Sequence, residues 1–311
     1  MFKNICIILI KQLLRKKKLK LLLVGFILLF SGFIFYKNIT YGVSFVSLSE
    51  MKNQHFLKKL PESNLFAGEE VHFKTKESYK NYYRELVSRT SNGGYTKFSL
   101  KNAGIWFPII EKILKEYKIP DDLKYLALAE SNLLNVRSPM GAAGFWQFTR
   151  VAGKEMGLVI NDEVDERLDP IKSTHAACKL LKRSYTYFGS WSSAIAAYNL
   201  GGTALFFAFR NQRVNSYYDL KLNAETASYV YKIVALKDLV ENTKKYGMSY
   251  HRYGVAPSKL LAISQSIPNI MQFTAKQGLS YAKIKELNPW ILSNKLTLRD
   301  STKAFYIRVP R

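Results

Sequence analysis

The chain has 311 residues, of which 48% are apolar, and its formal net charge at pH 7 is +24. This length is enough for one medium-sized domain with smaller additions, and the apolar content is ordinary for a globular protein. The positive charge favours acidic partners, although it can also serve solubility alone. Without an arginine-rich tract or zinc-finger spacing, we do not expect a nucleic-acid-binding protein.

The cysteines and histidines predict neither a disulfide framework nor a metal site. Cys6 and Cys178 stand far apart, and two cysteines are too few for such a framework. The histidines are also widely separated and fit no metal-ligand spacing: His55, His72, His175 and His251. We therefore expect a protein that works without a metal or another cofactor.

The N-terminus has the pattern of a membrane anchor. Basic residues between positions 15 and 20 precede an apolar run over residues 21–36, which is adequate for a span if its flanking lysines snorkel. The basic flank predicts that this end stays inside and the rest lies outside. No good cleavage site follows, so we favour an uncleaved signal anchor over residues 1–40 rather than a cleaved signal peptide.

Between the anchor and the main domain we expect a tether and a helical arm over residues 41–96. Residues 37–75 are polar and irregular in pattern, and a helix is predicted over residues 76–88. The sequence S-N-G-G at residues 91–94 predicts a break. The next helix is expected over residues 103–117.

A helix starting near Pro120 and running to residue 134 carries one acidic residue on its apolar side. Leu126 and Ala127 precede Glu130 by one turn, and Leu133 and Leu134 follow it by one turn. Burying an ionised carboxylate costs several kcal/mol, and a raised pKa is the usual escape. Glu130 is therefore either a proton donor near neutral pH or a salt-bridged residue at a helix end.

The segment after this helix predicts a sugar-binding cleft. A serine and a proline at residues 138–139 stop the helix, and Gly141 and Gly144 give a turn where backbone can approach a ligand closely. Trp146 and Phe148 then place aromatic faces on either side of the Gln147 amide.

Further helices predict an all-α domain over residues 97–248. They are expected over residues 151–156, from Pro170 to residue 187, over 191–198 and from 223 to 247. Asp169 is expected to cap the helix that starts at Pro170. Asp165 and Glu166 likewise look like capping or salt-bridge residues. We expect a small α+β module over residues 249–311, with strands at 260–263 and 305–309 around helices at 269–277 and 281–287.

Five motifs in this order resemble the lysozyme-like domain of lytic transglycosylases, most closely their membrane-bound D type. They are A-E-S-N-L at 129–133, S-P-M-G-A-A-G-F-W-Q-F at 138–148, D-E-R-L-D-P at 165–170, A-A-Y-N-L-G-G at 196–202 and E-T-A-S-Y-V at 225–230. The last module is similar in outline to a LysM fold. The resemblance implies a mainly helical, lysozyme-like catalytic domain between an N-terminal transmembrane helix and a small C-terminal module.

The resemblance also implies an activity and a site. The enzyme would cleave the β-1,4 bond between N-acetylmuramic acid and N-acetylglucosamine in peptidoglycan glycan strands, leaving 1,6-anhydro ends. Glu130 takes the place of the single catalytic acid and base. The matching substrate-binding positions are Ser138, Met140, Phe145, Gln147, Tyr198, Asn199 and Tyr229.

Two other functions remain open from the sequence. A hydrolytic muramidase would use the same fold and acid with water as the acceptor, and a wall-binding scaffold would use no acid. In each case we expect a monomer in the cell envelope, anchored in the cytoplasmic membrane with its main domain in the periplasm, or exported if the signal is cleaved.

Overall fold

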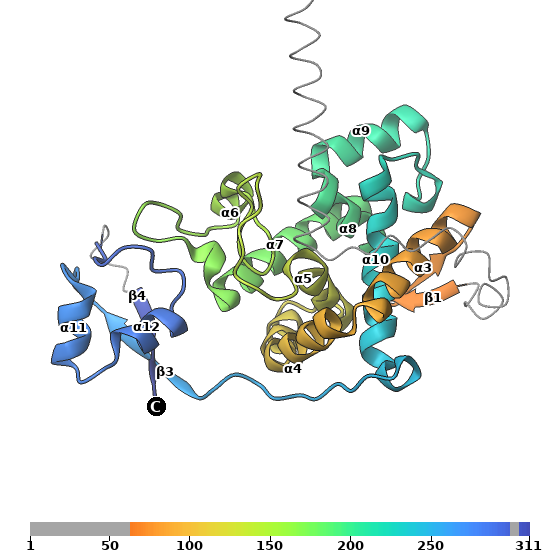
Figure 1. The fold of residues 1–311 in the computed structure, drawn as a ribbon. Helices are drawn as coiled ribbons and strands as arrows, with labels where there is room; N and C mark the ends of the chain where they lie inside the picture. Colours follow the sequence, from red (N-terminus) through yellow and green to blue (C-terminus); the bar gives the residue numbers. More distant parts are fainter. Residues whose placement is uncertain (1–62, 299–304) are drawn as a thin grey trace, which may run out of the picture. The chain divides into compact units, whose positions relative to one another are not determined.

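The computed structural model describes residues 63–298 and 305–311, which belong to one compact unit (Figure 1). This part of the chain is mainly helical, as predicted. The expected anchor lies outside the described residues. Among those described, no single helix is both long and apolar enough to cross a membrane. Within the same residues, the pair α8 (Trp191–Leu200) and α9 (Gly202–Gln212) has the length and apolar composition together, but it is bent by 116° at the junction.

A β-hairpin opens the described chain, and here the prediction of an irregular tether is wrong. β1 (Ser63–Phe66) and β2 (Glu69–His72) pair antiparallel, with Phe66 opposite Glu69. Phe66 and Val71 are buried in the main core. Each strand has only four residues and few apolar side chains, so no alternating pattern indicates a strand in the sequence. Tertiary packing therefore determines the structure of this segment.

α3 (Lys76–Ser91) and α4 (Gly93–Glu116) meet at a single residue. Asn92 ends α3 and its side chain accepts a hydrogen bond from the Tyr95 N–H at 3.3 Å as the N-cap of α4. The predicted break is therefore a change of direction without a loop. Because Gly93 and Gly94 lie in the first turn, α4 starts ten residues before the predicted position 103.

The helix that carries Glu130 is shorter than predicted. A 3-10 turn, η2 (Asp121–Leu123), leads into α5 (Lys124–Ser131). Asn132 and Leu133 then take left-handed backbone conformations with φ of 53° and 58°. Asn132 tolerates this conformation well, and Arg89 donates to its side-chain oxygen at 2.8 Å. Residues 132–134 therefore lie beyond the helix, although Leu133 is still buried.

The remaining helices of the domain mostly lie where they were predicted. They are α6 (Arg150–Glu155), η3 (Glu166–Leu168), α7 (Pro170–Phe188), α8 (Trp191–Leu200), α9 (Gly202–Gln212), η4 (Tyr217–Asp219), α10 (Ala224–Glu241) and η5 (Thr243–Tyr246). Asp169 caps α7 as predicted, since it accepts from the Ile171 and Lys172 N–H groups at 2.8 and 3.1 Å. α9 was missed: Gly201, with φ of 91°, ends α8, but a new helix begins at once.

α10 forms the centre of the main core. It packs against α3, α5 and α8, and Val230, Ile233 and Val234 are fully buried on it (Figure 1). This packing brings α5, which carries Glu130, beside the E-T-A-S-Y-V motif at the start of α10. Residues from both ends of the domain therefore meet at one place.

The C-terminal module has the predicted elements. β3 (Ser258–Ile263) and β4 (Phe305–Pro310) pair antiparallel with Leu261 opposite Ile307, and between them lie α11 (Ile270–Lys276) and α12 (Tyr281–Leu287). A second hydrophobic cluster is centred on Ile284, Trp290 and Ile307.

Candidate active site

Glu130 lies one residue before the end of α5 and is half-buried. Among the described residues its carboxylate has no hydrogen bond and no ion pair, so little offsets the cost of its lost hydration. Burial raises the pKa of Glu130 from 4.5 to about 7, as the sequence predicted in direction. A carboxyl group of this kind can exchange a proton near neutral pH.

Two charged residues of α10 modulate that burial effect. The ammonium group of Lys232 lowers the pKa of Glu130, and the carboxylate of Glu225 raises it, but burial is the larger influence. Lys232 Nζ also donates to the carbonyl oxygen of Ala129 at 2.9 Å, which fixes the cation next to the backbone of Glu130. No sequence pattern indicated Lys232, because its contact with Ala129 depends on how α10 packs against α5.

The two α8 residues of the predicted site have different surroundings: Tyr198 feels the charge of Glu130, and Asn199 contacts α10. The Tyr198 hydroxyl donates to the carbonyl of Trp146 at 2.6 Å. Burial, and then the negative charge of Glu130, raises the pKa of Tyr198 well above its usual value, so its hydroxyl stays protonated. Asn199 connects α8 to α10: its amide donates to Glu225 at 3.2 Å and its oxygen accepts from the Thr226 hydroxyl at 2.8 Å.

Tyr229 carries a buried hydroxyl without a partner. Its side chain is only 5% exposed, and the hydroxyl forms no hydrogen bond within the described residues. Glu225, Tyr229 and Lys232 are spaced at four and three residues along α10, so they share one side of the helix. A buried hydroxyl of this kind costs stability unless a ligand or water satisfies it.

The segment over residues 137–148, here called loop 137–148, folds on its own backbone. Arg137 pairs with Ala143, and Ala143 with Phe148, as antiparallel bridges. The Ser138 hydroxyl accepts from the Ala142 N–H at 3.0 Å. The Gln147 amide donates to the carbonyl of Gly144 at 2.8 Å, so its nitrogen serves the loop.

Two predicted cleft residues lie at opposite extremes of exposure. Met140 is 92% exposed at the tip of loop 137–148. Phe145 is 2% exposed and packs edge-to-face on Trp106 with ring centroids 5.0 Å apart. Its ring lines a cavity of about 620 Å³ together with Trp106 and Leu133, and Glu130 is not in the lining of that cavity.

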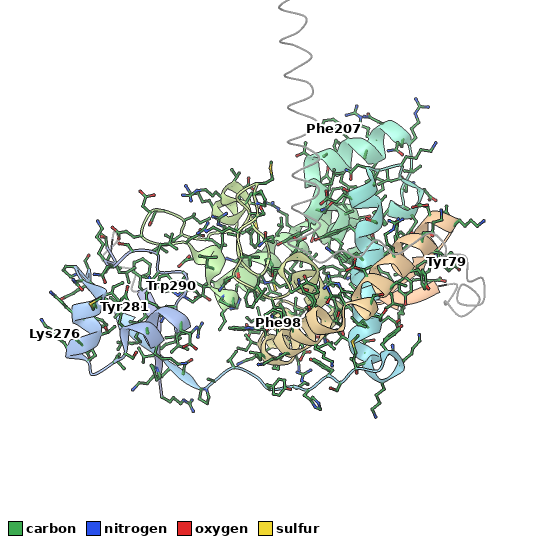
Figure 2. The ribbon with its side chains drawn as sticks, viewed as in Figure 1. Tyr79, Phe98, Phe207, Lys276, Tyr281 and Trp290 are labelled. Carbon is green, nitrogen blue, oxygen red and sulfur yellow. The ribbon has the colours of Figure 1, made fainter. Side chains whose placement is uncertain are left out.

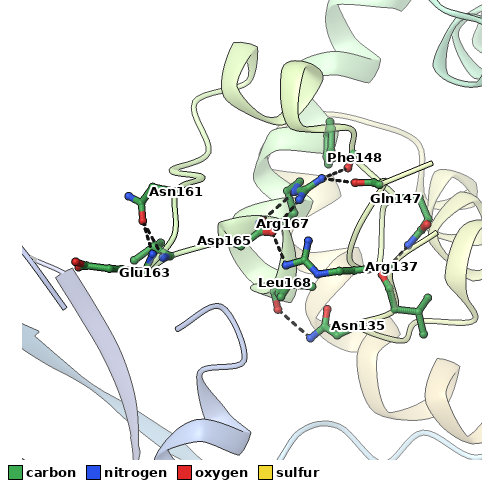
Figure 3. Close-up of polar contacts among 12 residues, drawn as sticks. Asn135, Arg137, Gln147, Phe148, Asn161, Glu163, Asp165, Arg167 and Leu168 are labelled. Carbon is green, nitrogen blue, oxygen red and sulfur yellow. Dashed lines mark hydrogen bonds and ion pairs between the residues drawn. The ribbon is translucent and has the colours of Figure 1, made fainter. Parts of the chain in front are cut away.

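A buried ion pair contacts the backbone of loop 137–148 (Figure 3). Asp165 is fully buried and Arg167 is 1% exposed, and Arg167 donates to both carboxylate oxygens at 2.9 and 2.8 Å. Another Arg167 nitrogen donates to the carbonyls of Gly141 and Phe148 at 2.8 and 2.9 Å. Arg137, at the start of the loop, reaches the same carboxylate at 2.7 Å.

Asp165 and Arg167 are here called the buttress. Burial acts to raise the pKa of Asp165, but the guanidinium groups of Arg167 and Arg137 outweigh it and hold that pKa below its usual value. The sequence indicated capping and salt-bridge roles for Asp165, which the structure confirms. The two arginines were missed, because their partners lie on loop 137–148 across the fold.

Comparison with known proteins fits this geometry. Residues 107–220 match the family model of the transglycosylase SLT domain. Over these residues the chain is therefore similar to transglycosylase SLT domains. Residues 259–311 match the model of the soluble lytic transglycosylase C-terminal LysM-like domain, in agreement with the LysM-like outline expected from the sequence.

The chain is also similar to curated lytic murein transglycosylases. The chain is 30% identical over 206 residues to membrane-bound lytic murein transglycosylase D of Escherichia coli K12 and of E. coli O6:H1, strain CFT073. These alignments cover 64% of this chain but only 44% of each relative, so the chain spans less than half the length of the proteins it matches. The solved structure of the E. coli 70 kDa soluble lytic transglycosylase SLT70 aligns with a TM-score of 0.39 at 18% identity, over 58% of this chain and 34% of that one.

Proposed function

We propose that this protein is a peptidoglycan lytic transglycosylase. It would cleave the β-1,4 bond between N-acetylmuramic acid and N-acetylglucosamine and leave a 1,6-anhydro-N-acetylmuramic acid end. The observation that carries the proposal is Glu130: one unpaired, half-buried carboxyl group with a pKa of about 7, inside an SLT domain.

In the first step Glu130 acts as the acid. Its proton passes to the glycosidic oxygen while the bond from that oxygen to the anomeric carbon breaks. A group with a pKa of about 7 is protonated often enough to donate at neutral pH and is still acidic enough to give the proton up. Glu130 is left as a carboxylate.

In the second step the same residue acts as the base. The carbonyl oxygen of the sugar's N-acetyl group can bond to the anomeric carbon first. The C6 hydroxyl of the same sugar then attacks the anomeric carbon and displaces that oxygen. Glu130 accepts the hydroxyl proton and returns to its starting state. The attacking hydroxyl belongs to the same sugar, so its effective concentration is high, and no water is consumed.

A second catalytic carboxylate has no obvious source among the described residues near this site. Asp165 is held between two arginines, and Asp169 caps α7. Glu166 pairs with Lys172. Glu225 is exposed and accepts from Asn199, which leaves Glu130 as the residue best suited to serve both steps.

The substrate-binding part of the proposal rests on the motif positions. We assign the glycan to the region around Glu130 that Tyr198, Asn199 and Tyr229 reach from α8 and α10. The unpaired Tyr229 hydroxyl is a donor suited to a sugar oxygen. From loop 137–148 come Ser138, Met140, Phe145 and Gln147. Phe145 would act through the loop backbone, because its ring packs on Trp106.

Anchoring and location are part of the same proposal. The basic and apolar segments within residues 1–40 would hold the chain in the cytoplasmic membrane with the SLT domain in the periplasm, next to its substrate. The curated relatives are named as membrane-bound, which supports this location.

The test is a Glu130→Gln variant assayed on purified sacculi. Loss of the acid should lower muropeptide release by about a thousandfold while binding to sacculi is kept. Glu155→Gln is the matched control, because Glu155 is exposed and only loosely paired with Arg183 at 3.6 Å. Release at the parental rate by Glu130→Gln would assign catalysis to another group. A parent protein that binds sacculi but releases nothing would be a scaffold.

A further inference from the structure

The C-terminal module and loop 137–148 share one hydrophobic core. Ala143, in the middle of the loop, is fully buried and belongs to the same cluster as Ile284 and Trp290 of the module. Val164 and Leu168 of the helical domain belong to it as well. The module therefore completes its core with a residue of loop 137–148. The same loop contacts the end of α5 next to Glu130, because the Ser131 hydroxyl donates to the Phe145 carbonyl at 2.8 Å.

Backbone hydrogen bonds join the module to the segment over residues 159–169, here called hairpin 159–169. Val164 pairs with Ile291 as an antiparallel bridge. The Asp165 N–H donates to the carbonyl of Trp290 at 2.9 Å. Trp290 lies on the side of the module that faces the helical domain (Figure 2), and the ammonium group of Lys172 on α7 stands 4.6 Å from the centroid of its ring.

Glu163 fastens the same hairpin through its side chain. Its carboxylate accepts from the N–H and hydroxyl of Thr297 at 2.8 and 3.1 Å, and Lys295 Nζ lies 3.0 Å away. Its backbone carbonyl accepts from the Leu292 N–H at 2.8 Å. The Glu163 side chain is 14% exposed, whereas its partner Lys295 is 60% exposed, so the Glu163 side is the more buried half of this contact.

The two ends of this chain of contacts meet in the buttress. The backbone N–H of Asp165 donates to Trp290 of the module, and its carboxylate pairs with Arg167. Arg167 in turn holds the backbone of loop 137–148 at Gly141 and Phe148. A continuous path of hydrogen bonds thus runs from Trp290 of the module through Asp165 and Arg167 to the backbone of the loop.

We propose that the C-terminal module is a positioning element for loop 137–148, so that it sets the rate of bond cleavage as well as any attachment to the wall. This inference rests on the proposed function, since it assigns the loop to the glycan site. A loop held from both sides keeps its cleft residues in place when substrate binds, and small misplacements at such sites are costly to kcat.

The test compares variants of the full-length protein. Glu163→Ala removes three contacts to the module, Glu163→Gln keeps the hydrogen-bond acceptor, and Ile291→Ala alters only the module side. Glu155→Ala is the control, since within residues 63–298 and 305–311 the one charged group that Glu155 contacts is Arg183. Amide hydrogen exchange of residues 137–148 is measured alongside kcat and KM on soluble, uncross-linked peptidoglycan.

We expect Glu163→Ala and Ile291→Ala to speed exchange in loop 137–148 and to lower kcat by about tenfold with KM nearly unchanged. Glu163→Gln should recover most of both losses. Unchanged loop exchange would overturn the proposal, and so would a higher KM at parental kcat, which describes a module that only binds wall. If the parent releases no product, the proposed function fails, and exchange still decides whether module and loop are coupled.

Discussion

At the scale of single residues, the proposed acid and base roles of Glu130 depend on opposing influences on the pKa of its carboxyl group. Burial raises the pKa of Glu130 to about 7, the nearby Lys232 lowers it and Glu225 raises it. Each pKa unit corresponds to about 1.4 kcal/mol of preference between the two protonation states. Because α5 packs against α10, burial and these two charges together keep the protonated and ionised forms of Glu130 close in free energy near pH 7.

Lys232→Gln tests this balance. Glutamine can still donate to the Ala129 carbonyl but carries no charge, so the influence that lowers the Glu130 pKa is lost and the pKa rises above about 7. The acid form then persists to higher pH, and the alkaline limb of the kcat/KM profile should move upward by up to about one pH unit.

Lys237→Gln is the control for that profile, because Lys237 lies on the same helix but pairs with Asp122. Its alkaline limb should match that of the parent. A Lys232→Gln profile that falls in activity without moving along the pH axis would mean that Lys232 has only a structural role.

At the scale of elements, loop 137–148 depends on one glycine more than on another. Gly144 has φ of +81°, and a Cβ atom there would stand 1.8 Å from the carbonyl oxygen of Arg167. Gly141 has a similar φ of +80°, but a Cβ atom there meets nothing within 4 Å. The two glycines share the left-handed backbone conformation and differ in the room available for a Cβ atom.

Alanine at each glycine separates these two effects. Gly141→Ala should cost about 1 kcal/mol of unfolding free energy, the price of the left-handed conformation. Gly144→Ala adds a backbone clash at the buttress and should cost at least about 2 kcal/mol more, with loss of activity. Urea denaturation measures both. Equal losses in the two variants would show that loop 137–148 does not pack on Arg167.

Local chemistry explains which elements could be predicted. Asp169 before Pro170, and Gly189 after α7, act through bonds and backbone angles that neighbouring residues determine, so the sequence located both ends of α7. The β1–β2 hairpin was missed because it depends on tertiary packing. The early start of α4 and the whole of α9 were missed because the residues that cap these helices look like breaks in the sequence. The motifs predicted Glu130 and Tyr198 as site residues, whereas Lys232 and Arg167 act through contacts across the fold that no local pattern indicates.

At the scale of the whole molecule, the net charge of +24 predicts how the protein would bind the proposed substrate, peptidoglycan. Stem peptides of peptidoglycan carry carboxylates, and a positive surface attracts them over distances of about 10 Å at 0.1 M salt and about 3 Å at 1 M. Binding to sacculi should therefore weaken as salt is raised. Sacculi with amidated carboxylates are the control, and salt-independent binding to untreated sacculi would contradict this role of the charge.

The mass of the products released from purified sacculi by the full-length protein tests the central claim most directly. One carboxyl group, with the C6 hydroxyl of the sugar as acceptor, predicts muropeptides ending in 1,6-anhydro-N-acetylmuramic acid, each lighter by one water than its hydrolysed counterpart. Muropeptides with free reducing ends would contradict the account and identify a hydrolytic muramidase.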